Sequence, residues 1–373
     1  MRILQVAPEI APGSGVAGVA HALEQAWQRA GVATSRFTLD DAAGRWLPRP
    51  GPGLRGRLAL LARVAWFSTV GTVLARRAAH RDPDTLVVCH NDALAGDVYV
   101  NHGLLRVAMR ARGHYRWRMV RNPVHLLTAA RDSYRYASTT HRAVVSLTAS
   151  DEAALRETYP RLRPASYVVG NGVDLDRFRP PTEQQRAAAR ARVGAHPDDV
   201  VAVFVGHEHE RKGLPLLIAA AAGLPHVRVV VVGGTPDLVA VARQQAEAAR
   251  VADRVVLVGT TADPRPYLHA GDALVLASAY EANALVVLEA LATGLPVVAT
   301  AVGYAGDVVL PGINGYLVER TVASVRRALA ALPAPEEQRH AEMRTAARAS
   351  VADLDWDAVA ARYLDLLTGL DPA

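Results

Sequence analysis

Short runs of consecutive valine-rich residues recur through the second half of the chain, each closed by glycine or another small residue. The clearest runs are Val200–Gly206, Val227–Gly234, Arg254–Gly259, Ala273–Ser278 and Pro296–Thr300. Continuous apolar runs with alanine-rich stretches between them are typical of strands buried on both faces of a parallel sheet. Strands with one solvated face would alternate polar and apolar residues instead. The pattern therefore predicts an α/β fold with doubly wound parallel sheets.

The first half carries similar but fewer runs, at Arg2–Ala7, Thr85–Cys89 and Ala143–Leu147. A chain of 373 residues is too long for one ordinary core, so two Rossmann-like domains are expected. Glycine and proline interrupt the periodicity at Val168–Pro181, which places the junction there. We predict a first domain over residues 1–170, a second over 171–350, and a C-terminal helix within 351–373.

The single cysteine, Cys89, excludes an intrachain disulfide. The chain opens on a strand-like run and not on a basic, apolar and cleavable leader. Its longest uncharged run, Ala290–Gly306, is interrupted by glycine and proline and is shorter than the roughly 20 apolar residues of a spanning helix. These features lead us to expect a cytoplasmic protein with no transmembrane segment.

Positive charge is concentrated in the first half of the chain. The net charge is +6, yet the segment Asp41–Arg142 alone holds 17 Arg against 6 Asp and no Glu, a local balance of +11. Such a region suits anionic lipid, nucleic acid or a phosphorylated substrate, and it suits a solvated arginine-rich surface equally. Within it, Leu54–Arg77 mixes Arg with large apolar residues, which fits a helix on a membrane surface or an internal helix of the first domain.

A glycine-rich segment follows the opening strand and fits the spacing G-x-G-x-x-G. Its glycines are Gly13, Gly15 and Gly18. This spacing lets backbone approach a phosphate at a helix N-terminus. An oxidoreductase reading would use Asp40 or Asp41 for the ribose of a dinucleotide. Against that reading, the five residues Pro8–Pro12 separate the strand from the first glycine, whereas a dinucleotide turn begins almost at the strand's end.

Two glutamates flank the start of a helix in the second half. Asn283 is a good N-cap, residues 284–292 have helical composition, and Gly294 follows as a helix terminator. Glu281 is thus expected in the loop before the helix and Glu289 in its second turn. The free amides of a helix N-terminus suit a diphosphate, and carboxylates beside it accept hydrogen bonds from sugar hydroxyls.

These segments together resemble the retaining glycosyltransferases of family 4, which have the GT-B architecture of two facing Rossmann-like domains. The similarity runs in order through the glycine loop, "YVVGNGVDLDRFRP", "FVGHEHERKGLPLLIAA" and "SAYEANALVVLEALATGLPVVAT". The last segment carries the E-x7-E signature at Glu281 and Glu289. The resemblance implies transfer of a sugar from a nucleotide diphosphate sugar, and a final helix that packs back toward the first domain.

By this resemblance, Arg211 and Lys212 bind the diphosphate and offset charge as it leaves. Lys212 is the only lysine in the chain, so 41 of the 42 basic residues are Arg. Glu281 contacts the transferred sugar and Glu289 holds the ribose. His102 lies where the family places a histidine near the donor sugar and acceptor, with His90 as the second choice.

The remaining donor-binding residues implied by the resemblance are Gly13, Gly15, Gly206, His207, Ala284, Leu285 and Val286. Two departures from the family pattern stand out. Residues 282–284 read Ala-Asn-Ala where the signature usually carries glycine, an aromatic residue and glycine. His207 replaces the arginine that often follows the glycine of "FVG", so phosphate binding relies more on the cations at 211 and 212.

The implied mechanism is metal-independent transfer with retention at the anomeric carbon, without a cofactor. Preorganised cations and helix amides stabilise the departing phosphate, and front-face attack assisted by that phosphate is the preferred route. The metal-binding tripeptide Asp-x-Asp of the other glycosyltransferase fold occurs four times, starting at Asp82, Asp174, Asp353 and Asp355, and four unrelated contexts make it unspecific.

The expected donor is a UDP- or GDP-sugar, and the acceptor is a hydroxyl of a lipid-linked glycan, a polysaccharide or a natural product. The basic first half suggests peripheral contact with anionic lipid at the inner membrane face, and no nucleic acid partner is expected. Other function classes stay open. These are a nucleotide-sugar epimerase of the same fold, an NAD(P)-dependent oxidoreductase, and a sugar-nucleotide binder that has lost activity through its altered signature.

Overall fold

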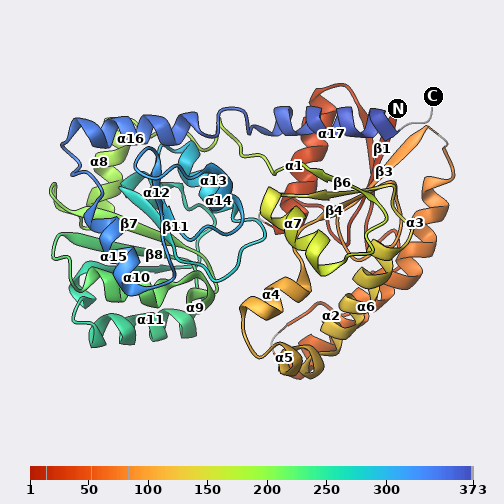
Figure 1. Cartoon of the computed structure of the whole chain (residues 1–373), viewed down its shortest axis with the longest axis horizontal. Coiled ribbons are helices and arrows are strands. Elements are labelled where there is room, and N and C mark those ends of the chain that lie inside the picture. The colour runs from red at the N-terminus through yellow and green to blue at the C-terminus, as the bar shows by residue number, and fades with distance from the viewer. Residues whose placement is uncertain (14, 52, 83, 371–373) are drawn as a thin grey trace. The chain divides into compact units, whose positions relative to one another are not determined.

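The computed structural model describes residues 1–13, 15–51, 53–82 and 84–370 (Figure 1). The chain forms two compact units. The first comprises Met1–Gly172 and the segment from Trp356 onward, and the second comprises Val173–Asp355. The divisions thus fall after Gly172 and after Asp355, within a few residues of the limits expected from the sequence.

The first unit is built on a six-stranded parallel sheet. In spatial order its strands are β2 (Ala33–Phe37), β1 (Arg2–Val6), β3 (Thr85–Cys89), β4 (Val98–Asn101), β5 (Ala143–Ser146) and β6 (Ala165–Val168). Strands β3, β4 and β5 are almost entirely buried because helices cover both faces of the sheet.

The second unit repeats this plan with another six-stranded parallel sheet. Its spatial order is β12 (Gly315–Leu317), β11 (Val297–Ala299), β10 (Ala273–Leu276), β7 (Val200–Val205), β8 (Val227–Val232) and β9 (Val255–Gly259). The expected doubly wound parallel-sheet fold is confirmed, since every valine-rich run of the second half forms a strand.

Four strands lie outside the apolar runs noted in the sequence, namely β2, β4, β6 and β12. Three of them, β2, β6 and β12, are sheet edges and only partly buried, so they lack a continuous apolar run. Strand β4 is buried but only four residues long. A run that short gives no periodicity to detect.

The helices of the first unit are α1 (Gly15–Arg29), α2 (Gly53–Trp66), α3 (Thr72–Ala79), α4 (Leu105–Ala111), α5 (Tyr115–Arg121), α6 (Pro123–Ala137), α7 (Ala149–Thr158) and α17 (Trp356–Leu370). Helix α17 lies beside α1 although 326 residues separate their nearest ends. Trp27 joins them, because its indole N–H donates to the Ala360 carbonyl at 3.2 Å and its ring meets Tyr363 edge-on at 6.0 Å.

The helices of the second unit are α8 (Glu183–Arg192), α9 (His209–Lys212), α10 (Leu214–Ala221), α11 (Pro236–Ala248), α12 (Arg265–Ala270), α13 (Leu285–Ala292), α14 (Tyr304–Val308), α15 (Val322–Ala330) and α16 (Gln338–Ala349). A buried carboxylate, Asp272, ties α8 and α16 to the sheet. It accepts from Arg186 at 2.5 Å, from His340 at 3.1 Å and from the Val201 amide at 2.7 Å. Burial alone would raise the pKa of Asp272, but these donors lower it to about 2.

One helix differs from the sequence expectation about membranes. Helices α2 and α3 join through a π-helical turn at Phe67–Gly71 into a 27-residue helix, Gly53–Ala79, which by length and composition is long and apolar enough to span a membrane. This helix does not stand out in the sequence, where only uncharged runs were considered and Arg63 interrupts this one. One third of its apolar stretch is buried, and Phe67 and Ala75 belong to the core of the first unit.

Each sheet has a point where the strand order reverses. In the first sheet the chain moves from β1 outward to β2 and then returns to β3 on the other side of β1. In the second it moves from β7 to β8 and β9 and returns to β10 on the other side of β7. Ligands of open α/β sheets bind outside the carboxyl ends of the strands at such points.

Candidate functional site

The candidate site of the second unit lies where the loops after β7 and β10 meet. The loop after β7 carries Gly206 and His207 and leads into α9, which ends at Lys212. The loop after β10 carries Glu281 and leads into α13. Because β7 and β10 are neighbours, both loops emerge side by side at the reversal point of the sheet.

Glu281 is buried and connects the two loops. Its Oε1 atom lies 3.0 Å from a guanidinium nitrogen of Arg211, 3.0 Å from Lys212 Nζ and 2.9 Å from the donating hydroxyl of Ser278. All three contacts use the same oxygen, so within the described ranges the second carboxylate oxygen remains available to a ligand.

Arg211 is held from several sides. Its Nε donates to Glu208 at 2.7 Å, and its Nη1 donates to the Tyr280 carbonyl. Burial works against its charge, but the bond to Glu208 and the charge of Glu281 raise the pKa of Arg211 above its ordinary value. The guanidinium is therefore a fixed, permanent cation beside Glu281.

Lys212 reaches Glu281 across Gly206. A Cβ atom placed on Gly206 would lie 2.3 Å from Lys212 Cδ and 2.8 Å from Cε. The lysine stem therefore occupies the space that any other residue at 206 would fill. This contact explains a glycine at 206 without invoking an unusual backbone angle.

The Gly206→Ala variant is expected to fold normally and to lose about 10- to 100-fold in activity, because the new methyl group displaces the flexible Lys212 chain from the site. Thermal unfolding and initial rates of sugar transfer measure the two effects. Gly369→Ala is the matched control, since a Cβ there meets nothing within 4 Å. Full activity in Gly206→Ala would show that the position of the ammonium is unimportant.

The start of α13 differs from the sequence prediction. Asn283 was expected to cap the helix, but the N-cap is Ala284, without a side-chain hydrogen bond, and the helix begins at Leu285. The Asn283 Oδ1 atom is buried without a hydrogen-bond partner among the described residues. Backbone amides in the first turn of a helix have no acceptor within the helix, and in the part of the chain that the structure describes no capping side chain accepts from Leu285 or Val286. These two amides therefore stay available for an anion.

Glu289 lies in the second turn of α13, as the sequence predicts, and is half-buried. Burial raises its pKa from 4.5 to about 7, although the charge of Arg177 acts in the opposite direction. Within the described part of the chain the carboxylate has no hydrogen bond or ion pair. It is thus a poorly solvated acceptor that lacks a protein donor.

His207 is exposed, and its Nδ1 accepts from the Gly234 amide at 3.2 Å. A neutral ring bound in this way carries its proton on Nε2, which makes His207 a donor at the edge of the site. The neighbouring His209 is buried and packs edge-on against Phe204 at 5.6 Å. His209 is thus a packing residue of the second unit.

In the first unit, α1 begins at Gly15, and eight residues separate it from the end of β1 at Val6. Gly13 and Gly15 have φ angles of 139° and 75°, and a Cβ on Gly18 would lie 2.0 Å from the Gly13 carbonyl. The glycines thus form a tight loop against α1. Residue 14 lies outside the described residues.

The dinucleotide reading of this loop loses its ribose-binding acid. Asp41 Oδ2 accepts from the amide and the hydroxyl of Thr38 at 2.8 Å and 2.7 Å, and Asp40 is exposed near Arg45. The long connection between β1 and α1 also differs from a dinucleotide turn. The structure gives no support to the oxidoreductase alternative.

His90 and His102 lie together at the carboxyl ends of β3 and β4. His90 Nδ1 is 3.1 Å from His102 Nε2, and the rings stack at 5.4 Å. On its other side, His90 Nε2 is 2.7 Å from Gln5 Oε1, while Gln5 Nε2 donates to the Ala20 carbonyl at 2.9 Å. The two histidines expected as alternatives therefore form one chain of contacts.

The direction of this chain follows from the Gln5 amide. Since its oxygen faces His90, His90 Nε2 must donate, and burial lowers the pKa of His90 well below its usual value. A neutral His90 then accepts at Nδ1, so His102 Nε2 donates. Burial lowers the pKa of His102 to about 4, which leaves its Nδ1 as an unprotonated acceptor at neutral pH.

The Gln5→Leu variant is expected to unfold with a free energy about 1–3 kcal/mol lower, because the His90 N–H and the Ala20 carbonyl lose their partners inside the core. Urea denaturation measures this change. Gln25→Leu, on the exposed face of α1, is the control and should shift stability by less than about 0.5 kcal/mol. Equal effects in both variants would contradict the buried network.

Gln5 and Ser278 were not singled out in the sequence. Gln5 is a lone polar residue within the apolar run "RILQVA", which is the one signal that could have marked it. Among the residues that the structure describes, no group of three or more His, Cys, Asp or Glu could hold a metal ion. The Asp-x-Asp tripeptide that starts at Asp82 includes residue 83, which lies outside the described ranges.

In sequence, the chain is similar to known glycosyltransferases. Residues 185–349 match the family model described as glycosyl transferases group 1. The chain is 35% identical over 237 residues to a D-inositol 3-phosphate glycosyltransferase of Xylanimonas cellulosilytica, which covers 60% of this chain and 56% of that protein. It is 38% identical over 178 residues to the protein of the same name from Mycobacterium marinum, covering 45% and 37%. The matched region thus spans about half or less of these relatives' length.

Solved structures share the fold over almost the whole chain. A sucrose-phosphate synthase from Thermosynechococcus elongatus aligns with a TM-score of 0.76 at 20% identity, covering 99% of both chains. The HepE protein of Anabaena, in complex with UDP and glucose, aligns with a TM-score of 0.70 at 20% identity, covering 99% of this chain and 100% of that one. The two α/β units are therefore those of the GT-B class.

Proposed function

We propose that the chain transfers a sugar from a nucleotide diphosphate sugar to a hydroxyl acceptor, with retention and without a metal. The match of residues 185–349 to the group 1 glycosyl transferases supports this proposal. The observation that carries this proposal is the cluster of Arg211, Lys212 and Glu281 at the reversal point of the second sheet, beside the open amides of α13. Two cations and a helix N-terminus form a site for a diphosphate.

The charges of the unliganded site balance. Glu281 faces both cations, and Glu208 pairs with Arg211. A bound diphosphate would compete with these carboxylates for the same donors. Arg211 and Lys212 would then stabilise the negative charge that develops on the departing phosphate oxygen. Glu281, held through one oxygen, would keep the other for a hydroxyl of the transferred sugar.

Glu289 is proposed to bind the two ribose hydroxyls. It is the acceptor without a protein donor, and ribose hydroxyls would supply the missing hydrogen bonds. His207 would add a donor to the phosphates, and the amides of Leu285 and Val286 would complete the diphosphate site. Gly13 and Gly15 are proposed to contribute backbone amides from the first unit.

His102 is proposed to accept a hydrogen bond from a hydroxyl of the donor sugar or the acceptor. Its neutral state with an unprotonated Nδ1 suits an acceptor and does not suit a general acid. In front-face transfer, the bond between the anomeric carbon and the phosphate oxygen breaks as the acceptor oxygen attacks from the same side. The leaving phosphate takes the acceptor's proton, so no protein nucleophile is needed.

A UDP-sugar is the first donor to test, since the Anabaena protein was crystallised with UDP and glucose; GDP-sugars form the second group. The acceptor is proposed to be a hydroxyl of a lipid-linked glycan, a polysaccharide or a natural product. We place the protein in the cytoplasm, with peripheral contact at the inner membrane face.

Incubation with UDP- and GDP-sugars, followed by mass spectrometry, tests the proposed reaction. Transfer or slow donor hydrolysis would support it, and NMR of the product's anomeric proton would report retention. An isomerised donor would identify an epimerase instead. Binding without turnover would point to a sugar-nucleotide binder whose Ala282-Asn283-Ala284 segment has removed activity.

Transfer is expected to continue at an unchanged rate in excess EDTA, because Arg211 and Lys212 supply the positive charge that a metal would otherwise provide. Initial rates with and without EDTA measure this. A rate abolished by EDTA and restored by manganese would contradict the metal-independent mechanism.

A further inference from the structure

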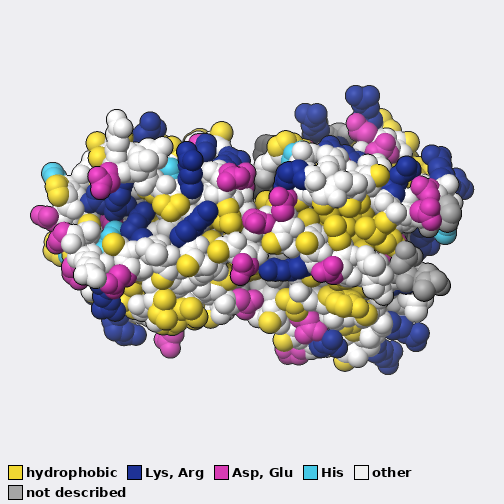
Figure 2. Space-filling view, turned by 90° about the horizontal axis from the view of Figure 1, so that it is seen from above, with side chains coloured by type: hydrophobic (Ala, Val, Ile, Leu, Met, Phe, Trp, Pro, Cys, Tyr) yellow, Lys and Arg dark blue, Asp and Glu magenta, His cyan; other side chains and the backbone are white. Residues whose placement is uncertain are grey.

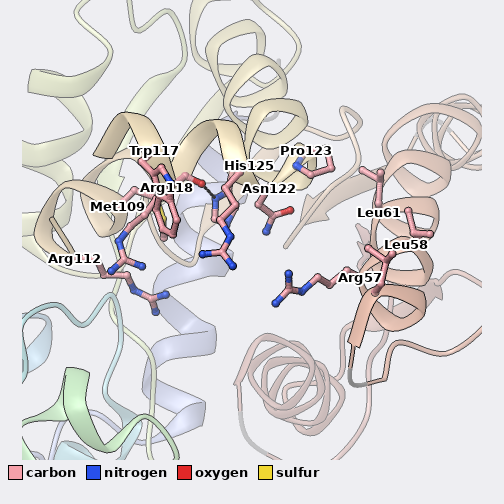
Figure 3. A pocket seen from close by; sticks show the side chains of 12 residues that line it. Arg57, Leu58, Leu61, Met109, Arg112, Trp117, Arg118, Asn122, Pro123 and His125 are labelled. Carbon is pink, nitrogen blue, oxygen red and sulfur yellow. Dashed lines mark hydrogen bonds between the residues drawn. The ribbon is translucent and has the colours of Figure 1, made fainter. Parts of the chain in front are cut away.

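A cleft of about 450 Å³ opens in the first unit between α2 on one side and α4, α5 and the start of α6 on the other. Figure 3 shows Arg57 extending from α2 toward the wall that carries Asn122 and His125. His125 Nδ1 lies 3.0 Å from the Arg118 carbonyl, which braces α5 against α6. All residues that line the cleft belong to the first unit, whereas the cluster around Glu281 belongs to the second.

Large apolar side chains are exposed around this cleft. Leu54 is 72% exposed, Leu58 55% and Trp117 57%, and all three line the cleft. Next to them Val120 is 72% exposed on α5. Isolated exposed apolar residues are ordinary, but several around one cleft indicate a partner with an apolar phase.

The same walls are strongly basic. Arg57, Arg118 and Arg121 line the cleft, and of the described residues that line it none is acidic. Residues 42–81 hold 8 Arg and residues 98–131 hold 7 Arg, with no Asp or Glu in either segment. By contrast, Figure 2 shows basic and acidic side chains intermingled on the face of the molecule seen there.

Arg57, Arg118 and Arg121 have no carboxylate partner within the described residues. Arg118 Nε donates to the Gly113 carbonyl at 2.9 Å, and the Arg121 guanidinium stacks over Trp117 at 4.5 Å from the ring centroid. These cations are grouped at one cleft without an acidic partner, and such a group favours binding of an anion from outside the chain.

We infer that this cleft binds the phosphate head group of an anionic lipid within a bilayer, while Leu54, Leu58, Trp117 and Val120 enter the interfacial layer. An apolar rim that surrounds a cationic cleft matches an anionic membrane surface, where phosphates lie just above the acyl chains. A nucleic acid would match the charge but not the exposed leucines and valine. A soluble phosphate would leave this apolar rim in water.

Helix α2 supports the same assignment. It belongs to the 27-residue helix Gly53–Ala79. One third of the stretch of this helix that is apolar enough to span a membrane is buried. The buried side, with Ala59, packs on the unit, and the side with Leu54, Arg57 and Leu58 is exposed. This inference rests on the peripheral membrane contact proposed above and names the surface that makes it, but it does not depend on sugar transfer.

Flotation of the full chain with vesicles tests the inference. We expect binding to vesicles of equal phosphatidylcholine and phosphatidylglycerol, and little binding to phosphatidylcholine alone. Binding should weaken when salt rises from about 0.1 M to about 1 M, which shortens the screening length from about 10 Å to about 3 Å. The double variant Arg57→Gln, Arg121→Gln should lower the membrane partition coefficient by about 30-fold. Each arginine contributes about 1 kcal/mol near an anionic surface, which corresponds to about fivefold.

The matched control is Arg192→Gln, Arg243→Gln, which removes the same charge from exposed helix positions of the second unit. It should retain most of the binding. Trp117 fluorescence should shift to shorter wavelength with anionic vesicles, and the shift should be absent in Trp117→Phe. Equal loss in both double variants, equal binding to neutral vesicles, or binding to a DNA duplex but not to vesicles would each overturn the inference.

Discussion

Lys212→Arg is expected to lower the rate of sugar transfer by at least about tenfold while leaving the unfolding midpoint unchanged. The variant keeps the charge, so the loss would come from shape. The lysine stem passes over Gly206, and its compact ammonium shares Glu281 Oε1 with Arg211 and Ser278. A planar, longer guanidinium does not fit beside another guanidinium at one oxygen.

Lys212→Ala sets the scale for this experiment and should cost about 10²–10³-fold in kcat, the usual effect of removing one donor that stabilises developing negative charge. Arg243→Lys, the reverse substitution at an exposed position, is the control and should leave the transfer rate unchanged. If Lys212→Arg transfers sugar at the full rate, the single lysine of the chain is a coincidence of composition.

Glu289→Gln is expected to stabilise the protein above pH 7 and to weaken nucleotide binding. The pKa of Glu289 is about 7 in the folded chain against an ordinary 4.5, so the folded state holds this proton more tightly than the unfolded state. The contribution to stability is then complete below about pH 4.5 and is lost as the pH rises toward 7. Its size is at most about 3 kcal/mol.

Urea denaturation of both proteins from pH 5 to pH 8 measures this effect. The wild-type free energy of unfolding should fall relative to that of Glu289→Gln as the pH rises, and the difference should level off above pH 7. Glu247→Gln on the exposed face of α11 is the control and should follow the wild type. Parallel curves for wild type and Glu289→Gln would show that residue 289 is ordinarily solvated.

Nucleotide binding should depend on the same ionisation. An ionised Glu289 would accept from both ribose hydroxyls, so the affinity for UDP or GDP should rise as the pH increases from 5 to 8. Glu289→Gln should weaken binding by about 10- to 100-fold, the usual strength of hydrogen bonds to a charged acceptor, and should remove the pH dependence. Calorimetric titration with each nucleotide measures both.

The sequence predicted the sheets well because the strands that form their centres are buried on both sides. A stretch such as "VVAVFV" has no polar residue that would fit any exposed position. It predicted the site less completely. Arg211 and Lys212 follow β7 and Glu281 follows β10, and only the neighbouring places of these two strands bring both cations within 3.0 Å of Glu281.

Other parts of the site depend on contacts that no local pattern reveals. The capping preference of Asn283 was overridden by the path of the loop, which places Ala284 at the start of α13. Gln5 determines the tautomer of His102 through His90, across residues 85 and 12 positions apart in the sequence. Such a relay exists only once β1, β3 and β4 lie side by side in the sheet.

The return of α17 to α1 affects how the chain is made. The second unit is one continuous stretch, so it can fold as soon as it has left the ribosome. Most of the first unit is synthesised before the second but lacks α17 until Trp356–Leu370 has been made, and until then Trp27 has neither the Ala360 carbonyl nor the Tyr363 ring to cover it. The half of the protein that is made first is therefore the half that is completed last, and its unfinished surface is what chaperones would meet during synthesis.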